Sequence, residues 1–201
     1  MSASQSVEGG ELSCKLTVDG KTLEGSVEVR LDPRVAPPKA ALKEIVEDNF
    51  EFATKVRDDL SAVSRTVIGL QAVRKQIKDA LPLWEKQEAA KGIKADADKL
   101  IARLDALERK LHNPDAEVAY DILAKKGGAK LYSQLATLFG FLIDSDGPVT
   151  QGMRETYEEW SRELKTLEAE WHGCVEAVGA LDAELRRRGV RHVFVPPAEK
   201  E

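Results

Sequence analysis

Aromatic residues and long apolar runs are scarce in this chain, and each scarcity excludes a class of protein. Phe, Trp and Tyr together make up only 5% of the 201 residues, whereas charged residues make up 32%, a balance typical of long solvated helices. No apolar run approaches the ~20 residues that a membrane-spanning helix needs, so we predict no membrane span. The net charge is −5 with the two signs interspersed, which gives no basic footprint for nucleic acid.

Patterns that carry metal or nucleophile chemistry are missing as well. The histidines are His112, His172 and His192, and no two of them have the spacing of metal ligands on one helix face. Cys14 and Cys174 decide little, because a disulfide needs Cα atoms within about 7 Å and the sequence leaves that distance open. We therefore predict no metal, no cofactor and no catalytic residue in this chain.

Two loops imitate ligand-binding motifs without completing them. Asp144, Asp146 and Glu155 match the first, third and twelfth positions of a calcium loop, but Val149 stands where such a loop requires glycine. The Gly-Gly-Ala-Lys sequence at 127–130 lacks the spacing of a phosphate-binding loop. We interpret the first as a loop that ends a helix, and we predict no phosphate site at the second.

The N-terminal sequence MSASQSVEGG has no basic region followed by an apolar core, so it does not match a secretory signal. Its serines and glycines predict a mobile segment over residues 1–10. We expect the chain to be either cytosolic or a fragment of a longer protein.

Apolar residues repeat at alternating steps of three and four along three segments, the heptad pattern of helices packed at a shallow angle. The first segment, within 42–81, places these residues in one seam: Val46, Asn49, Ala53, Val56, Leu60, Val63, Val67, Leu70, Arg74, Ile77 and Leu81. The second consists of Met153, Tyr157, Trp160, Leu164, Leu167, Trp171, Cys174, Val178, Leu181 and Leu185. The third, shorter segment consists of Ala97, Leu100, Leu104, Leu107 and Leu111. The polar Asn49 and Arg74 are expected to set register rather than to bind a ligand.

Helix boundaries follow from capping and breaking residues. The first helix is expected to start near Lys39 and to end or kink at Pro82. Helices are expected over about 95–112 and 128–143, and a long last helix opens after Thr150 as N-cap and stops at Gly189.

A β-hairpin is predicted before the helices. Apolar residues alternate with polar ones on both sides of Asp19-Gly20, a strong hairpin signal, over ELSCKLTVDGKTLEGSVEVRL. Two strands alone are marginally stable in water, so their apolar face must pack on something. We favour a hairpin that completes a sheet whose other strands are missing over one that lies on the bundle.

The predicted fold is mainly α: an elongated antiparallel helical bundle of three to four helices, two of them long, preceded by a β-hairpin. We divide the chain into a mobile N-terminus (1–10), the hairpin (11–34), the bundle (35–188) and a tail (189–201). The prolines of DPRVAPP, residues 32–38, predict a stiff linker between hairpin and bundle.

Three segments in order, LTVDGKTLEGSVEVRLDPRV, LHNPDAEVAYDILAKKGGAKLYSQL and DGPVTQGMRE, carry a family resemblance. Together they resemble the C-terminal region of large bacterial exported proteins with BNR/Asp-box, sortilin-like β-propellers, which are often labelled glycosyl hydrolases or sialidase-like proteins. The resemblance covers nearly all of residues 11–188. It implies that the hairpin is the remnant of an Ig-like or fibronectin-like sheet and that the parent protein is exported.

The resemblance implies no catalytic residue here, because the propeller blades and their Asp-box repeats are not in this chain. It directs attention to segments 113–128 and 144–153, and the binding surface expected there consists of Asn113, Tyr120, Asp121, Lys130, Tyr132, Gln151 and Arg154. Loop packing and capping are the competing explanation for these residues.

Three functions remain open from the sequence. The first is a non-catalytic structural or protein-interaction module, the C-terminal part of a larger exported propeller protein. The second is an accessory domain of a glycoside hydrolase-like enzyme, and the third is a self-associating coiled-coil adaptor. The expected partner is the propeller portion of the parent protein or another protein, and a homo-oligomer is a further alternative.

Overall fold

The computed structural model describes residues 10–30, 39–116, 127–145 and 147–196. The N-terminal segment 1–9, the linker 31–38 and the end of the tail, 197–201, lie outside the described residues, so the mobility and stiffness expected there stay predictions. The described chain is mainly α, as predicted, with a hairpin of β1 (Gly10–Val18) and β2 (Lys21–Val29) followed by helices α1 (Lys39–Trp84), η1 (Glu88–Ala90, a 3-10 turn), α2 (Ile93–Leu111), α4 (Leu131–Asp144) and α5 (Gln151–Arg187).

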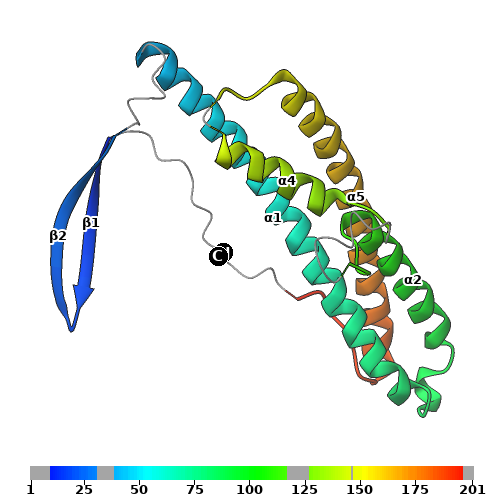
Figure 1. Ribbon diagram of the computed structural model, residues 1–201. Coiled ribbons are helices and arrows are strands. Elements are labelled where there is room, and N and C mark those ends of the chain that lie inside the picture. Colours follow the sequence, from blue (N-terminus) through cyan, green and yellow to red (C-terminus); the bar gives the residue numbers. More distant parts are fainter. Residues whose placement is uncertain (1–9, 31–38, 117–126, 146, 197–201) are drawn as a thin grey trace.

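The helices form an elongated antiparallel bundle (Figure 1). Helix α1 runs the length of the bundle, α2 and then α4 return along it, and α5 runs back in the direction of α1. Helix α1 packs against α2, α4 and α5, and α5 also packs against α2 and α4. At any level the core therefore lies between α1, α5 and one of the two shorter helices.

The heptad prediction is confirmed in full for two helices. Every predicted core position of α2 is buried, and every one of α5 is buried or half-buried. In α4, Leu131, Leu135, Leu138 and Leu142 are buried and Phe139 packs against the core.

In α1 every predicted seam position is buried or half-buried, but only four of the eleven are fully buried. Val56, Val63, Leu70 and Ile77 are fully buried, as expected. The alternate row, Ala53, Leu60, Val67, Arg74 and Leu81, is half-buried, and the row one residue earlier supplies Phe52, Thr66, Val73 and Ala80 to the core. The reason is that α1 has neighbours on more than one side, which requires a wider apolar stripe than the two-row seam of a single helix pair.

This difference in burial predicts that the same substitution lowers stability by unequal amounts at two valines of α1. Val73 is fully buried although it lies off the predicted seam, whereas Val67 lies in the predicted seam but is half-buried. We expect Val73→Ala to lower the free energy of unfolding by about 2 kcal/mol and Val67→Ala by less than half as much, measured by chemical denaturation. Equal losses, or a larger loss at Val67, would contradict the observed register.

Local signals place most helix ends. Pro82 does not end α1, which continues to Trp84. Glycines with positive φ lie where the chain must reverse, Gly92 (φ 86°) before α2 and Gly189 (φ 66°) after α5. Thr150 caps α5 as predicted, because its Oγ1 accepts a hydrogen bond from the Met153 backbone N–H at 3.3 Å.

The segment after α5 is held on the side of α1. The side-chain amide of Gln76 donates to the Phe194 carbonyl at 3.0 Å and accepts from the Phe194 N–H at 3.2 Å. The indole Nε1 of Trp84 donates to the Arg191 carbonyl at 2.9 Å, and Val193 is fully buried. These contacts tie the end of the described chain to the core of the bundle.

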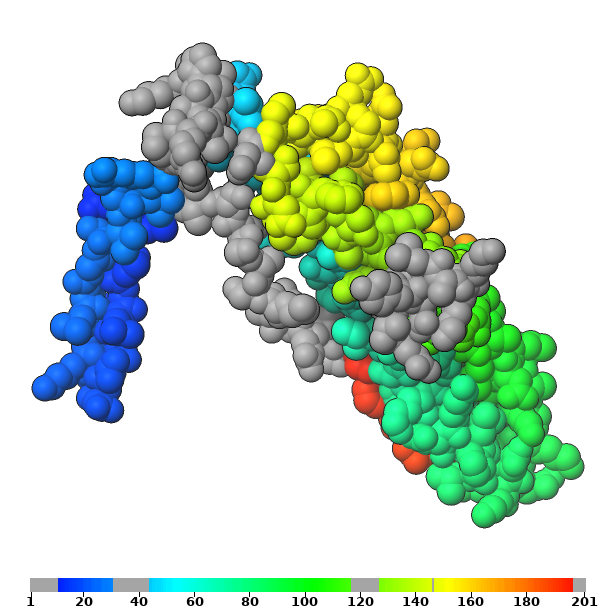
Figure 2. Space-filling view, in the orientation of Figure 1, coloured from blue at the N-terminus to red at the C-terminus, as the bar shows by residue number. Residues whose placement is uncertain are grey.

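The predicted hairpin is confirmed. Asp19 (φ 48°) and Gly20 (φ 76°) form the tight turn, and the antiparallel register pairs Leu12 with Val27 and Leu16 with Leu23. These pairs share one face of the hairpin, because directly opposed residues project to the same side. In Figures 1 and 2 the hairpin stands apart from the helices.

Candidate functional site

The residues predicted to bind fall into two groups at opposite ends of α4. Lys130 is the residue that precedes α4 and Tyr132 lies in its first turn, whereas Gln151 and Arg154 follow its C-terminal end, at the start of α5. The 14 residues of α4 span about 20 Å. Tyr120 and Asp121 lie outside the described residues, so the structure does not place them.

The first group packs in a loop. Asn113 is buried; its Nδ2 donates to the Gly128 carbonyl at 3.2 Å and its Oδ1 accepts from the Asp115 N–H at 3.1 Å. A Cβ added at Gly127, whose φ is 98°, would lie 3.2 Å from Asn113 Nδ2. Asn113 therefore fastens the loops on either side of segment 117–126, while Tyr132 is exposed.

The second group fastens the start of α5 to α1. Arg154 forms an ion pair with Asp48, and its guanidinium lies 5.1 Å from the centroid of the Phe52 ring. Gln151 Nε2 donates to Glu155 Oε1 at 2.6 Å within α5. The polar seam residue Asn49 acts nearby: its Nδ2 donates to the Gly147 carbonyl at 2.9 Å and its Oδ1 accepts from the Val149 N–H at 3.1 Å. Asn49 therefore positions the loop between α4 and α5, a structural role like the one predicted for it.

A buried carboxylate that sequence reasoning missed lies between α1 and α2. Glu108 is only 2% exposed. Its carboxylate accepts hydrogen bonds from Arg74 Nη1 and, at 2.6 Å, from Gln71 Nε2, and it lies 3.1 Å from His112 Nε2. Arg74 also pairs with Asp105 at 2.6 Å. Two features of the sequence could have indicated this cluster. One is the arginine in the first seam, and the other is the spacing of Glu108 and His112 by one helical turn.

The electrostatics of this cluster are those of a structural ion pair. Burial alone would raise the pKa of Glu108, but hydrogen bonds from Arg74, Gln71 and His112 outweigh it and lower the pKa. The Arg74 guanidinium fills the place beside the carboxylates that a bound cation would take. A general acid or base needs an accessible carboxyl that can change its proton near neutral pH, and Glu108 is neither accessible nor near that range.

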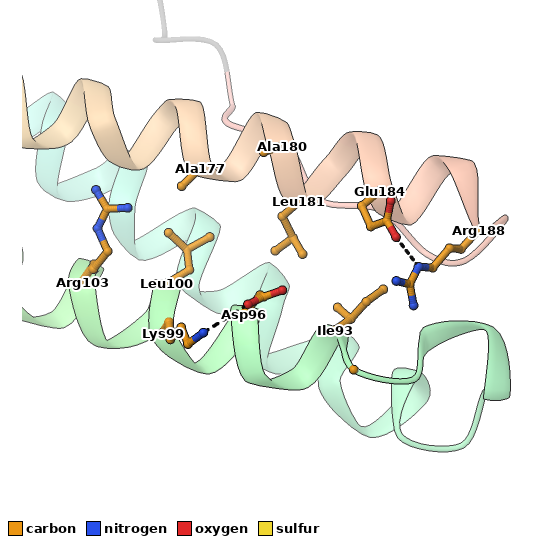
Figure 3. A pocket seen from close by; sticks show the side chains of 11 residues that line it. Ile93, Asp96, Lys99, Leu100, Arg103, Ala177, Ala180, Leu181, Glu184 and Arg188 are labelled. Atoms are coloured by element: carbon orange, nitrogen blue, oxygen red, sulfur yellow. Dashed lines mark hydrogen bonds and ion pairs between the residues drawn. The ribbon is translucent and has the colours of Figure 1, made fainter.

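A groove of about 490 Å³ lies between α2 and α5, lined on its apolar side by Ile93, Leu100, Ala177 and Leu181 (Figure 3). The charges at its end are paired with one another or with the backbone. Arg188 Nε donates to Glu184 at 2.6 Å, and Arg188 Nη1 donates to the Lys91 carbonyl at 2.8 Å. Hydrogen bonds from Arg187 and Arg188 lower the pKa of Glu184 to about 2. The groove therefore presents shallow apolar contact area with no converging acid, base or nucleophile.

The described residues contain no group of three or more His, Cys, Asp or Glu side chains that could hold a metal ion. The two cysteines are not paired with each other: Cys14 is exposed and Cys174 is buried, and burial raises the pKa of the Cys174 thiol. None of the described helices combines the length and apolar composition needed to cross a membrane.

One face of the hairpin is an apolar surface that the described fold leaves open. Leu12 (41%), Leu16 (59%), Leu23 (68%) and Val27 (52%) are exposed, and the register puts them on the same face. The opposite face carries polar pairs, among them Lys15 and Glu24, whose charged groups lie 3.1 Å apart. The hairpin is therefore amphipathic, with its apolar side uncovered.

Helix α4 is apolar on more than its core side. Its sequence LYSQLATLFGFLID contains no charged residue before Asp144, in a chain in which 32% of the residues are charged. Four leucines fill the core, yet Tyr132 and Phe141 (60% exposed) extend the apolar character to the surface. Tyr132 and Phe141 are nine residues apart, which places them on opposite flanks of the helix, with Ser133, Ala136, Thr137 and Gly140 on the side between them.

No family model, no curated protein and no solved structure matches this chain, so the site is defined by its own geometry.

Proposed function

We propose that this chain is a non-catalytic protein-interaction module whose docking surface is the apolar face of the hairpin. The observation that carries the proposal is the exposure of Leu12, Leu16, Leu23 and Val27 on one face. Burying such side chains against a partner is favourable by about 25 cal/mol per Å² of apolar surface. A hairpin that is marginal alone is thereby stabilised when it binds.

The bundle serves in this proposal as the rigid body that presents the hairpin. Its core runs through all of the described helices, from Phe52 near the start of α1 to Val193 after α5. The polar clusters at Asn49, Asn113 and Glu108 join helices and loops within the bundle. Their side chains serve packing, which supports a scaffold rather than an enzyme.

The partner proposed for this module is the propeller portion of a larger exported protein. What supports this partner is the resemblance of residues 11–188 to the C-terminal region of sortilin-like propeller proteins. In that setting the apolar face of the hairpin would pack against the propeller portion, including the sheet domain that joins propeller and bundle.

The test is binding by the purified chain, measured by light scattering coupled to chromatography, alone and mixed with the propeller portion of a protein of that family. We expect association, and we expect Leu23→Asp to weaken it at least ~100-fold because a charge would enter the apolar contact. Thr22→Asp is the matched control, because Thr22 lies on the opposite face, beside Thr17, and its substitution should leave binding unchanged. A chain that remains monomeric and binds no propeller would contradict the proposal, and so would turnover of glycosides.

A further inference from the structure

The hairpin has open strand edges as well as an open face. Among the described residues β1 pairs with β2 alone, so the outer backbone groups of each strand have no strand beside them there. Residues 11–18 of β1 are all exposed, and in Figures 1 and 2 the hairpin stands apart from the helices. An open edge can pair with a strand of another chain. This surface consists of main-chain groups, so it is distinct from the apolar face that docks in the proposed function.

The turn of the hairpin determines which backbone groups of β1 point outward. Asp19 and Gly20 both have positive φ, as in a type I′ turn, and the flanking residues Val18 and Lys21 then form a hydrogen-bonded pair. Hydrogen-bonded and non-hydrogen-bonded pairs alternate along an antiparallel ladder. The N–H and C=O groups that point away from β2 therefore belong to residues of the polar face: Glu11, Ser13, Lys15 and Thr17.

Opposite charges select one register for the pairing of β1 with β1 of a second copy. Two antiparallel copies can exchange backbone hydrogen bonds only through the outward groups. Pairing Ser13 with Ser13 of the second copy puts Glu11 opposite Lys15 on both sides of the axis. Registers centred on Glu11 or Lys15 place like charges opposite each other, which is destabilising, and the remaining registers oppose no charges at all. The favoured register therefore has a twofold axis at Ser13.

Within its own hairpin Glu11 faces another acid. It lies directly opposite Glu28, and like charges in such a pair are destabilising. In the part of the chain that the structure describes, the basic residues of the hairpin pair with other acids: Arg30 lies 2.5 Å from Glu28, and Lys15 lies 3.1 Å from Glu24. Lys15 of a second copy would supply the cation that Glu11 lacks in this hairpin.

The edge of β2 offers no comparable register. Its outward groups belong to residues that include two acids and no base: Thr22, Glu24, Ser26 and Glu28. Two copies of β2 would place these carboxylates opposite each other or opposite neutral residues. Antiparallel pairing of β1 with β2 of a second copy gives one ion pair at most. The charge pattern therefore favours pairing between two β1 edges.

We propose that two copies of this chain pair through their β1 edges, antiparallel and centred on Ser13, to form one four-stranded sheet. Glu11, Ser13 and Lys15 of each copy would exchange about six backbone hydrogen bonds with the other copy. Directly opposed residues project to the same side, so the two apolar faces join into one. Pairing is favourable because a four-stranded sheet with an apolar face is more stable than a lone hairpin.

The contact is small, so the expected dimer is weak. In this register residues 10–16 of the two strands overlap, a length of about 24 Å. With a sheet about 10 Å thick, the contact buries roughly 500 Å² when both sides are counted. An interface of this size belongs to the transient class, and we expect a dissociation constant on the order of 100 μM.

The first test measures this constant for the full chain by sedimentation equilibrium at concentrations up to about 1 mM. Glu11→Lys should raise the dissociation constant about tenfold, because two attractions become two repulsions, although it removes the repulsion from Glu28 within the hairpin. Glu11→Lys combined with Lys15→Glu should restore the dimer. Glu28→Lys is the matched control, because it makes the same charge change in the same cross-strand pair but on β2, and it should change the constant less than ~twofold. A monomer at every concentration, or equal effects of the two single substitutions, would overturn the inference.

The second test removes one backbone donor from each edge in turn. Ser13→Pro deletes an N–H at the twofold axis that does not bond to β2, so it should abolish the dimer and keep the hairpin. Ser26→Pro is the matched control, because Ser26 lies directly opposite Ser13 on the outer side of β2. It should leave the dissociation constant unchanged. Contacts between Leu12 and Val27 in NMR spectra report whether the hairpin remains formed, and a dimer that survives Ser13→Pro would contradict edge pairing.

The third test locates the register by disulfide formation, with Cys174→Ala in every chain. Leu12→Cys places a thiol directly opposite Cys14 of the second copy, in a non-hydrogen-bonded pair with Cα atoms about 4.5 Å apart. Leu16→Cys is the control, equally far from Cys14 along the strand but opposite Gly10 of the second copy. We expect a covalent dimer for Leu12→Cys and at least ~10-fold less for Leu16→Cys. Equal yields would overturn the register.

The inference and the proposed function can fail separately. A chain that stays monomeric but binds the propeller portion through Leu23 would overturn the edge pairing and leave the proposed function in place. A dimer that is lost with Ser13→Pro but binds no propeller would overturn propeller docking and support the edge pairing. Self-association that neither Glu11→Lys nor Ser13→Pro weakens would mean contact through another surface, and it would overturn the inference.

Discussion

Replacing Arg74 by alanine is expected to lower the free energy of unfolding by about 3–5 kcal/mol, the usual cost of removing one partner from a buried ion pair. Glu108 would keep its charge at 2% exposure with only Gln71 and His112 beside it. The pair is only partly shielded from water on the arginine side, where the Arg74 side chain is 21% exposed, so the lower end of this range is the expected value. Chemical denaturation at pH 7 measures it.

A matched control for this prediction is Lys75→Ala, the next residue along α1. Lys75 pairs with Asp79 at 2.6 Å, but both side chains are exposed, and such pairs contribute only about 0–1 kcal/mol. Replacing Arg74 and Glu108 together by methionine should recover most of the loss, because no uncompensated charge then remains. A double variant as unstable as Arg74→Ala would mean that packing, not charge, accounts for the loss.

The difference in unfolding free energy between the natural chain and Arg74→Ala is expected to change with pH in one direction. In the natural chain the folded-state pKa of Glu108 is lowered, so its contribution is complete above the ordinary carboxyl pKa of about 4.3 and is lost as the pH falls below that value. Without Arg74, burial raises the pKa of Glu108, and the carboxyl takes up a proton at higher pH. The gap in stability between natural chain and variant should therefore shrink between pH 7 and pH 4, and a gap that widens would contradict this account.

The parts of the fold that the sequence predicts correctly are those that local chemistry determines. The tight turn of the hairpin requires two residues with positive φ, and Asp19 and Gly20 supply them. Helix α5 has its core positions on one continuous stripe from Met153 to Leu185. A periodic pattern is sufficient for a helix of this kind.

The register of α1 depends on tertiary neighbours and could not be obtained from periodicity. Leu60 and Val67 fit a two-row seam better than Thr66 does, yet Thr66 is the buried residue. The heptad assumes a single neighbouring helix. Helix α1 packs against three, so the buried stripe is wider and its second row shifts by one residue.

The predicted binding residues were chosen from loops, where the path of the chain decides proximity. Asn113 and Arg154 are far apart because α4 separates them, and each meets partners remote in sequence, Gly128 and Asp48. The lack of charge in α4 is visible in the sequence, where thirteen consecutive residues, 131–143, carry none. Of the predicted binding residues, this uncharged segment contains Tyr132.

Replacing Leu70 by alanine is expected to be a strongly destabilising truncation in α1. Leu70 is fully buried in the middle of the helix, in the row shared with Val63 and Ile77. Its neighbour Gly69 approaches the Trp171 ring so closely that an added Cβ would lie 3.1 Å from Cζ2, so α1 and α5 have little freedom to close a cavity there. We expect a loss of about 3–5 kcal/mol, from lost burial and from the cavity that remains.

Leu83→Ala is the matched control for this truncation, with the same side chain on the same helix but 45% of its surface exposed. It should cost less than about 1 kcal/mol, because an exposed side chain loses little contact on truncation. Denaturation with two probes, helix content and the combined fluorescence of Trp84, Trp160 and Trp171, measures both variants. Losses of similar size would mean that the packing between α1 and α5 relaxes around Leu70, and that the narrow core is more deformable than the close contact of Gly69 with Trp171 implies.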